Sequence, residues 1–385
     1  MLLELFVILL KIAGVVLGFA FPLGAALTLF GDRKQSALVQ NRVGPNRARL
    51  PFIHASLLGI PHLIADSIKM IFKEDIIPDK ANHFWHTIAP ALSVFPAIAL
   101  WAVIPFMDLY CVGSAAPALV DGTFRDVCTG ETRNWFSIAN LDVGLLYVFA
   151  ISSISVYGAA IAGWASNNKY SLLGGLRSSA QMISYEVSMA LSIMGLLIVY
   201  GTLNLNEMAA LQGHLLFGWL PMWGIVVQPL SFFLFFVIMM AETKRAPFNA
   251  PEGESEIVAG YFTEFSSMKF GVIQLSEYIA TVFVGALVST LFLGGWQIPW
   301  LYADGFHFST DAAEPTLALP YWLVVMLRIG AFSLKTLFLV WLQFMLRWTL
   351  PSFRYDQIMT LGWKVLLPLS LLNLFVTAFV VTVLL

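Results

Sequence analysis

Charged residues are scarce in this sequence. Asp, Glu, Lys and Arg make up 11% of its 385 residues, whereas soluble globular proteins carry about 25%. Hydrophobic residues make up 59%, and the mean hydropathy is +0.80. The composition excludes an ordinary soluble domain. It predicts a polytopic membrane protein, in which each spanning segment must satisfy its own backbone hydrogen bonds.

Cysteine is nearly absent, and the common cofactor motifs are missing. The only cysteines are Cys111 and Cys128, and no CxxC pair or Cys/His cluster occurs. We therefore expect no metal site, neither zinc nor an iron–sulfur cluster, in this chain. The sequence has no Walker loop, no GxGxxG after a strand and no basic–aromatic patch, so we expect no nucleotide site and no nucleic-acid partner.

Long apolar runs recur along the chain. A spanning helix needs about 20 mostly apolar residues. Eight runs are interpreted as spans: 3–30, 88–107, 143–165, 178–200, 220–241, 269–294, 321–346 and 361–384. No repeat or low-complexity linker divides them, so we predict an all-α fold with one membrane domain, residues 1–385. The first run is too long for a cleavable signal peptide and lacks a small-residue cleavage site.

The basic residues predict the orientation of the chain. Of the 21 Lys and Arg residues, 16 follow odd-numbered spans and only Arg125 and Arg133 lie in the opposite loops. Loops rich in Lys and Arg face the cytoplasm. We expect a multi-pass protein of the bacterial inner membrane with both termini on the periplasmic side; an organellar inner membrane is the alternative. Cys111 and Cys128 then share the outward loop 108–142, where a disulfide and two unpaired thiols are both permitted.

Residues 53–73 have the pattern of a helix that lies in the membrane interface. Apolar residues recur at spacings of three and four, and the opposite face carries polar residues such as His62, Asp66 and Lys69. This pattern is typical of an interfacial helix, and Pro61 is expected to bend or interrupt it. The helix is either a surface anchor or the lip of an opening for a lipid-soluble molecule.

Acidic residues are concentrated in the predicted cytoplasmic loop 242–268. Glu242, Glu252, Glu254 and Glu256 lie there among prolines and aromatic residues, a mixture that favours a packed loop. Clustered carboxylates repel one another when ionised, so some pKa values should rise and the group could exchange protons. The alternative is a solvated acidic loop that caps the helix ends.

Two more acids lie inside predicted spans, where a charged residue costs roughly 2.5–3.5 kcal/mol near the centre. Glu186 lies beside the face that Gln181 and Tyr185 share, and Glu277 lies in the sixth span. A carboxylic acid can stay neutral in a low dielectric and take up or release a proton. Both are therefore candidates for proton transfer.

Basic residues suggest two kinds of pairing. Arg328 and Lys335 lie seven apart in the seventh span and are expected to pair with other charged residues of the spans or with a neighbouring subunit. The first cytoplasmic loop, GDRKQSALVQNRVGPNRARLP at 31–51, is rich in arginine around a stiff Gly-Pro-Asn turn. It is expected to attract anionic lipid or to dock a soluble partner.

Six motifs, taken in order, resemble one known family. They are QNRVGPN at 40–46, ADSIKMIFKED at 65–75, LRSSAQMISYE at 176–186, AETKRAPFNAPEGESEIVAGY at 241–261, EFSSMKF at 264–270 and RYDQIMTLGWKVLLP at 354–368. Together they resemble the NADH dehydrogenase subunit 1 family, the heel membrane subunit of respiratory complex I (NADH:quinone oxidoreductase). Each motif is weak by itself, but the ordered set covers nearly the whole chain.

The resemblance implies both a fold and a function. It implies eight spanning helices and an interfacial helix that join a peripheral redox arm to a proton-pumping membrane arm. The chain would form much of a chamber for the substrate quinone and would bind no cofactor itself, because flavin and iron–sulfur clusters lie on partner subunits. The other partners implied are small membrane subunits, antiporter-like subunits and membrane lipid.

The resemblance also assigns residues. Positions near the quinone chamber or the peripheral arm are Arg33, Gln40, Arg42, Asp66, Arg245 and Phe248. Positions on the proton-coupling path are Glu186, Glu242, Glu252, Glu254, Glu256 and Glu277. Asn249 stands where the family usually has Asp, so one acid of the cluster is missing. Two alternative functions remain: the membrane subunit of an energy-converting hydrogenase, which does not use quinone, and a stand-alone ion transporter.

Overall fold

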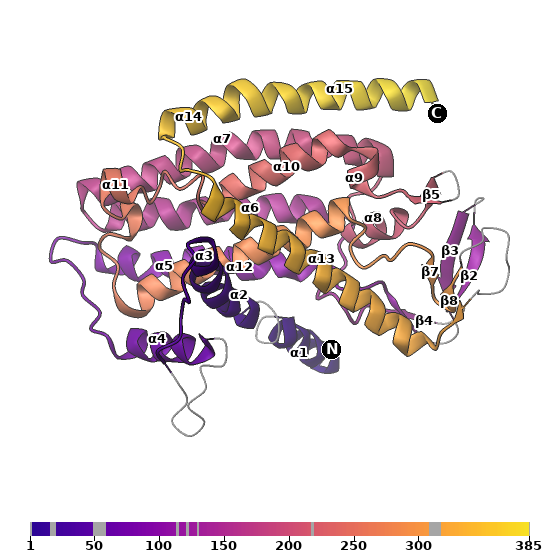
Figure 1. Ribbon diagram of the computed structural model, residues 1–385, viewed down its shortest axis with the longest axis horizontal. Coiled ribbons are helices and arrows are strands. Elements are labelled where there is room, and N and C mark those ends of the chain that lie inside the picture. The colour runs from indigo at the N-terminus through magenta and orange to yellow at the C-terminus, as the bar shows by residue number, and fades with distance from the viewer. Residues whose placement is uncertain are drawn as a thin grey trace.

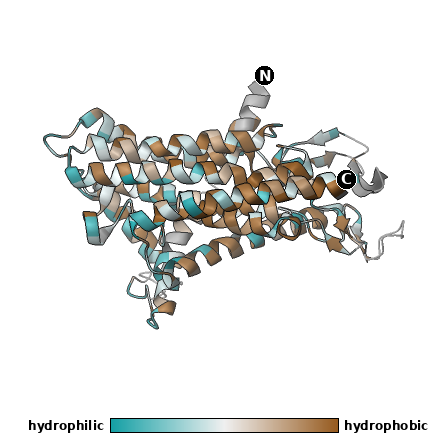
Figure 2. Cartoon of the chain, turned by 90° about the horizontal axis from the view of Figure 1, so that it is seen from above, coloured by the Kyte–Doolittle hydropathy of each residue, from teal (hydrophilic) through white to brown (hydrophobic). Residues whose placement is uncertain are grey.

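The fold is a bundle of long helices with short strands gathered at one end (Figure 1). The computed structural model describes residues 2–15, 21–48, 59–112, 115–120, 123–128, 131–216, 219–307 and 317–384. Hydrophobic residues cover most of the bundle, and hydrophilic residues gather at the end away from the C-terminus (Figure 2). This distribution is the one expected of helices that cross a membrane.

Within the described ranges, six helical segments are long and apolar enough to span a membrane. They are His83–Val103, Gly144–Ala165, Lys169–Tyr200, Ser267–Phe292, Tyr321–Thr349 and Tyr355–Val383. These correspond to the predicted spans 2, 3, 4, 6, 7 and 8. The first segment consists of α5 (His83–Ala99) and η4 (Leu100–Val103), and the last consists of α14 (Tyr355–Thr360), η6 (Leu361–Leu366) and α15 (Leu367–Leu384). The four between them are α6 (Gly144–Ala165), α7 (Lys169–Tyr200), α12 (Ser267–Phe292) and α13 (Tyr321–Thr349). Figure 1 labels the α-helices among these elements.

The other two predicted spans differ from expectation. Residues 3–30 contain α1 (Leu2–Val15), α2 (Phe21–Leu27) and the start of the π-helix η2 (Thr28–Gln35), and residues 16–20 lie outside the described part. Residues 220–241 contain β6 (Leu220–Pro221), α9 (Gly224–Val227) and the shorter apolar helix α10 (Pro229–Glu242). Pro229 explains the break, because a proline disfavours helical backbone at the residue before it, and Gln228 has a non-helical backbone with φ −134° and ψ 62°. A count of eight spans stays a prediction.

Shorter elements connect these helices. The remaining helices are α3 (Ser36–Val39), α4 (Ile60–Phe72), α8 (Leu205–Leu211), α11 (Glu254–Ile257) and η5 (Gly260–Phe262). The strands are β1 (Tyr110–Val112), β2 (Ala115–Val120), β3 (Thr123–Cys128), β4 (Glu131–Arg133), β5 (Leu215–Leu216), β6 (Leu220–Pro221), β7 (Leu301–Tyr302), β8 (Gly305–Phe306) and β9 (Leu317–Ala318). All the described strands form antiparallel pairs in loops, so the part suited to the membrane is helical, as predicted.

Helix ends explain why several spans start earlier than hydropathy alone predicts. The side chain of Asn82 accepts a hydrogen bond from the backbone of Trp85 at the start of α5. Asn168 caps α7 in the same way, and the left-handed Gly201 ends it. Such caps satisfy backbone groups that have no partner inside the helix. The result is a 32-residue helix α7 that extends beyond its apolar stretch.

Helix α12 is the centre of the bundle. It contacts α2, α5, α8, α10 and α13, and most of its side chains are buried. By contrast, α15 leaves an apolar face open that includes Leu372, Phe375 and Phe379. The first pattern is that of an interior helix and the second that of a helix facing lipid or another chain.

The outward loop 108–142 contains two hairpins, with β1 paired to β4 and β2 paired to β3. Cys111 and Cys128 form a disulfide, with Cα atoms 5.7 Å apart. Of the two alternatives that the sequence left open, the structure therefore contains the disulfide. It connects the two hairpins near their shared base.

Arg328 and Lys335 do not pair with each other. Arg328 binds Asp126 of β3 at 2.6 Å and lies 5.0 Å from the ring of Trp296. Lys335 donates to three backbone carbonyls just beyond α12, at distances of 2.6–3.0 Å. Within the described part of the chain, both cations thus bind loop groups and not the charged residues of other spans.

Candidate functional site

A cavity near the hydrophilic end lies between α4, the α2–η2 segment and α12. We call it the entrance cavity; its volume is about 410 Å³. Its lining combines apolar side chains with a few polar ones: Ala25, Asp32, Arg33, Leu63, Asp66, Ser67, Met70, Ile71, Met268, Gly271, Val272, Gln274, Leu275 and Tyr278. Pockets of this kind and size hold small organic molecules.

Helix α4 forms one wall of the entrance cavity. It begins at Ile60 after the left-handed Gly59, so Pro61 lies in the first turn, where a proline is tolerated. Residues 53–58 of the predicted interfacial helix lie outside the described part. Ile64 and Ile68 are exposed, with relative accessibilities of 53% and 49%, and form the outer apolar face that the sequence predicted. Asp66, however, lines the cavity.

Polar contacts hold α4 in place. Arg33 of η2 forms an ion pair with Asp66 at the cavity. At the other end of the helix, Ser267 donates to the carbonyls of Met70 and Lys73, both at 2.9 Å. Figure 1 shows α4 set apart from the main bundle, below α3 and the start of α12. The contacts of Ser267 thus hold α4 at its C-terminal end, and the Arg33–Asp66 pair holds it near its middle.

The loop 242–268, which we call the acid loop, is packed rather than solvated. Gln181 of α7 is fully buried and donates to the carbonyls of Ala241 and Phe248 at 2.8 and 3.0 Å. Phe248 and Tyr261 are also buried, with relative accessibilities of 3% and 1%. The amide side chain of Gln181 thus fixes both ends of the turn that follows α10, and the sequence-based expectation of a packed loop is confirmed.

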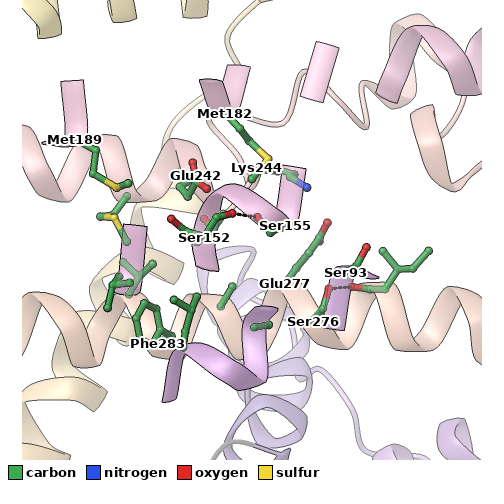
Figure 3. Close-up of a pocket in the computed structure, with 18 of the residues that line it drawn as sticks. Ser93, Ser152, Ser155, Met182, Met189, Glu242, Lys244, Ser276, Glu277 and Phe283 are labelled. Atoms are coloured by element: carbon green, nitrogen blue, oxygen red, sulfur yellow. Dashed lines mark hydrogen bonds between the residues drawn. The ribbon is translucent and has the colours of Figure 1, made fainter. Parts of the chain in front are cut away.

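The second cavity, which we call the inner cavity, lies between α5, α6, α7, α10 and α12 and measures about 70 Å³. Glu242, Lys244 and Glu277 border it, together with the hydroxyls of Ser93, Ser152, Ser155 and Ser276 (Figure 3). A water needs roughly 10–15 Å³ of such volume and two to four polar partners. The inner cavity is therefore suited to a few water molecules and too small for a drug-sized ligand.

Glu252 of the acid loop and Glu277 of α12 interact at the boundary between the loop and the helix. Tyr261 donates a hydrogen bond of 2.5 Å to the Oε1 atom of the buried Glu277. Burial raises the pKa of Glu252 to about 8, and repulsion from Glu277 acts in the same direction. A carboxyl group with such a pKa is mostly protonated at neutral pH and can release its proton when a nearby charge changes.

Arg245 lies beside the entrance cavity, packed against one of its lining residues. It is 7% exposed, and its guanidinium stacks 3.7 Å from the ring of Tyr278, which lines the entrance cavity. Asp32 lies 4.0 Å from Arg245 and 2.8 Å from Arg347. Glu277 and Tyr278 are neighbours on α12. Glu277 lines the inner cavity, and Tyr278 lines the entrance cavity. This stretch of α12 thus borders both cavities, and the buried Arg245 packs against it.

The other predicted site residues lie in different settings. Glu186 accepts a hydrogen bond from Ser153 of α6 and is partly buried. Glu256 lies at the surface, paired with Arg177 at 2.6 Å, and the side chain of Glu254 lies outside the described part. Gln40 and Arg42 are exposed and bonded to each other at 2.8 Å.

Phe248, which was assigned to the quinone chamber or the peripheral arm, lies in the protein interior. Its ring packs against Tyr185 and Phe353, at centroid distances of 5.9 and 5.7 Å, inside the main hydrophobic core. It lines neither the entrance cavity nor the inner cavity. The geometry therefore gives Phe248 a role in fixing the acid loop.

Sequence reasoning did not single out Lys244, Arg347 or the four serines of the inner cavity. The serines come from three different helices, so no local motif contains them. Lys244 belongs to the motif at 241–261, but the direction of its side chain depends on a turn that only the packed loop defines. Among the residues described, no group of three or more His, Cys, Asp or Glu side chains could hold a metal ion.

Fold and site together define a class: a helical membrane protein with a lateral cavity of ligand size and a buried cluster of ionisable residues beside it. Residues 11–378 match the family model described as NADH dehydrogenase. The chain belongs to this family.

Curated relatives cover nearly the whole chain. An NADH-quinone oxidoreductase subunit of Geobacter metallireducens is 42% identical over 92% of this chain and 91% of its own length. The corresponding NADH-quinone oxidoreductase subunit of Leptospira biflexa is 41% identical, over 92% of this chain and 89% of the relative. NADH-quinone oxidoreductase subunit 8 of Rhodothermus marinus is 39% identical over 93% of each of the two chains.

Proposed function

We propose that this chain is the membrane subunit of a proton-translocating NADH-quinone oxidoreductase, in which it admits quinone and couples quinone reduction to proton movement. The names of its relatives support the complex and the substrate. They also favour a quinone enzyme over a quinone-independent hydrogenase subunit or a stand-alone transporter. The proposal assigns the entrance cavity to quinone and the inner cavity to protons.

One observation supports the coupling role: neighbouring residues of one helix line the two cavities. Tyr278 faces the cavity that has room for an organic ligand, and Glu277 faces the cavity that has room for water. Buried charges interact strongly because little water screens them. A change of charge on a ligand in the entrance cavity would therefore be felt by Glu277 and by the neighbouring Glu252.

Residues of this chain would handle the proton as follows. Arg33 and Arg245 attract negative charge to the entrance-cavity side, and their pairing with Asp66 and Asp32 can weaken when that charge arrives. Glu252 and Glu277 then exchange a proton through Tyr261, and Glu242 receives it across the inner cavity. Glu186, on α7, follows Glu242 of α10 in this acidic path.

Partners and orientation complete the proposal. The exposed Gln40 and Arg42 belong to a surface that a peripheral subunit would cover, and that arm would carry the flavin and the iron–sulfur clusters. The exposed apolar faces of α13 and α15 would contact lipid or other membrane subunits. The strand-bearing end would face the periplasm, together with both termini.

The decisive experiment uses the assembled complex in proteoliposomes. Glu252→Gln combined with Glu254→Gln should lower NADH-driven proton uptake and slow quinone reduction, because two exchangeable protons are lost. Glu74→Gln, an exposed acid after α4, is the matched control and should behave as the wild type. Full quinone reduction together with full pumping in the double variant would contradict the proposal.

A further inference from the structure

Lys244 brings a positive charge to the inner cavity. Its side chain is 9% exposed, and it borders the same cavity as Glu242 and Glu277 (Figure 3). The residue has a left-handed backbone with φ 57°, which a residue with a side chain rarely adopts. Strained backbone of this kind persists where the surrounding structure imposes it, often at functional sites.

Lys244 differs from Arg328, which is buried, and from Lys335, which is partly buried, in its partners. Arg328 pairs with Asp126, and Lys335 donates to three carbonyls. Among the side chains that the structure describes, no carboxylate lies within 4.0 Å of the Lys244 ammonium. The ammonium also lies 5.4 Å from the centroid of the Tyr261 ring. The ammonium therefore faces the inner cavity without a direct ion pair.

A buried charge is costly unless another charge or water compensates it. The charged and titratable groups around Lys244 come from several elements: Glu242 of α10, Glu277 of α12, Glu252 and Arg245 of the acid loop, Tyr261 of η5 and Glu186 of α7. The lining residues of α5 and α6 contribute serine hydroxyls but no charge. Water in the cavity is thus the natural bridge between the ammonium and the two lining carboxylates.

We propose that Lys244 is the internal counter-charge of the inner cavity, and that it sets how many protons Glu242 and Glu277 hold between them. With the ammonium present, the cavity is neutral when one of the two carboxyls is protonated. Without it, neutrality requires both carboxyls to be protonated. Lys244 thereby leaves one carboxylate ready to accept a proton, which is the state a relay needs.

The interactions of Lys244 support this role. Burial lowers the pKa of Lys244, while Glu277, Glu242 and Glu252 raise it. The same residue opposes the effect of burial on Glu252. Lys244 is a positioning residue in this scheme, since it acts on the carboxyls and not on quinone. The inference rests on the proton path proposed above.

The test compares Lys244→Gln with Lys244→Arg in the assembled complex in proteoliposomes. Removal of an opposite charge raises a carboxyl pKa. In Lys244→Gln we expect the alkaline limb of the pH profile for proton pumping to move upward by roughly one unit or more. Lys244→Arg keeps the charge and should keep the wild-type profile, a rescue that a purely structural role does not require. Lys80→Gln, at an exposed lysine, is the matched control.

A compensated variant keeps the inference testable if Lys244→Gln does not assemble. Lys244→Gln with Glu242→Gln removes one charge of each sign and should assemble to the wild-type level. Failure of both variants to assemble would contradict the counter-charge role and indicate a packing role. An unshifted profile in Lys244→Gln would also overturn it. Normal pumping in Glu242→Gln alone would instead show that the proposed proton path is wrong.

Discussion

The hydroxyl of Tyr261 donates a hydrogen bond of 2.5 Å to Glu277, and this contact joins the acid loop to the central helix α12. Both side chains are buried. The contact places a titratable oxygen of the loop beside the carboxyl that borders the inner cavity. The contact therefore links a titratable group of the acid loop to one of α12, in addition to holding the loop against the helix.

Tyr261→Phe should destabilise the protein because it leaves a buried carboxyl oxygen without its donor. A group left unsatisfied in this way costs about 1–3 kcal/mol. We expect a lower midpoint of thermal unfolding for the detergent-purified complex and a lower ratio of protons pumped to quinone reduced. Tyr157→Phe, at an exposed tyrosine of α6, is the control. An unchanged midpoint and pumping ratio in Tyr261→Phe would show that the contact is dispensable.

Stability should depend on pH through Glu252, whose pKa is about 8 in the folded protein. The value in an unfolded chain is near 4.3, so the folded state binds the proton more tightly. This contribution to stability is complete below the unfolded pKa, falls as pH rises, and is lost once pH passes the folded pKa.

Glu252→Gln removes that dependence. The drop in thermal midpoint between about pH 6 and about pH 9 should be smaller in this variant than in the wild type. Glu74→Gln should leave the drop unchanged, because its side chain is exposed. An equal drop in Glu252→Gln and the wild type would mean that Glu252 does not titrate in this range.

The Arg33–Asp66 ion pair should control access to the entrance cavity. Both side chains are partly exposed, at 44% and 31%, so we expect little effect on stability. Asp66→Asn should change KM for a short-chain quinone by roughly twofold to fivefold, the size of a pair worth up to about 1 kcal/mol. The charge exchange Arg33→Asp with Asp66→Arg should restore part of the effect. An unchanged KM in Asp66→Asn would exclude the ion pair from quinone entry.

Gly174 allows α7 to approach the acid loop closely. A Cβ atom at this position would lie 2.6 Å from the backbone nitrogen of Tyr261. Gly174→Ala should therefore displace η5 and cost about 1–3 kcal/mol, which reduces the thermal midpoint and pumping together. Gly330→Ala is the matched control, because a Cβ there meets nothing within 4 Å. Equal midpoints for the two variants would contradict the tight packing.

The sequence by itself predicted much of the fold. Apolar runs identified six segments that the structure forms as long helices, and caps at Asn82 and Asn168 moved their starts by a few residues. Spacing predicted the apolar outer face of α4, and the interleaved aromatic residues predicted a packed acid loop. These features depend on local preference and burial, which composition and periodicity record directly.

The tertiary structure decided which residues meet. It brought Glu242, Lys244 and Glu277 to one cavity, left Glu256 at the surface, and placed Phe248 in the core. It also gave Arg328 and Lys335 separate partners. Contacts between segments far apart in sequence depend on helix packing and on single side chains such as Gln181, and no pattern along the chain contains that information.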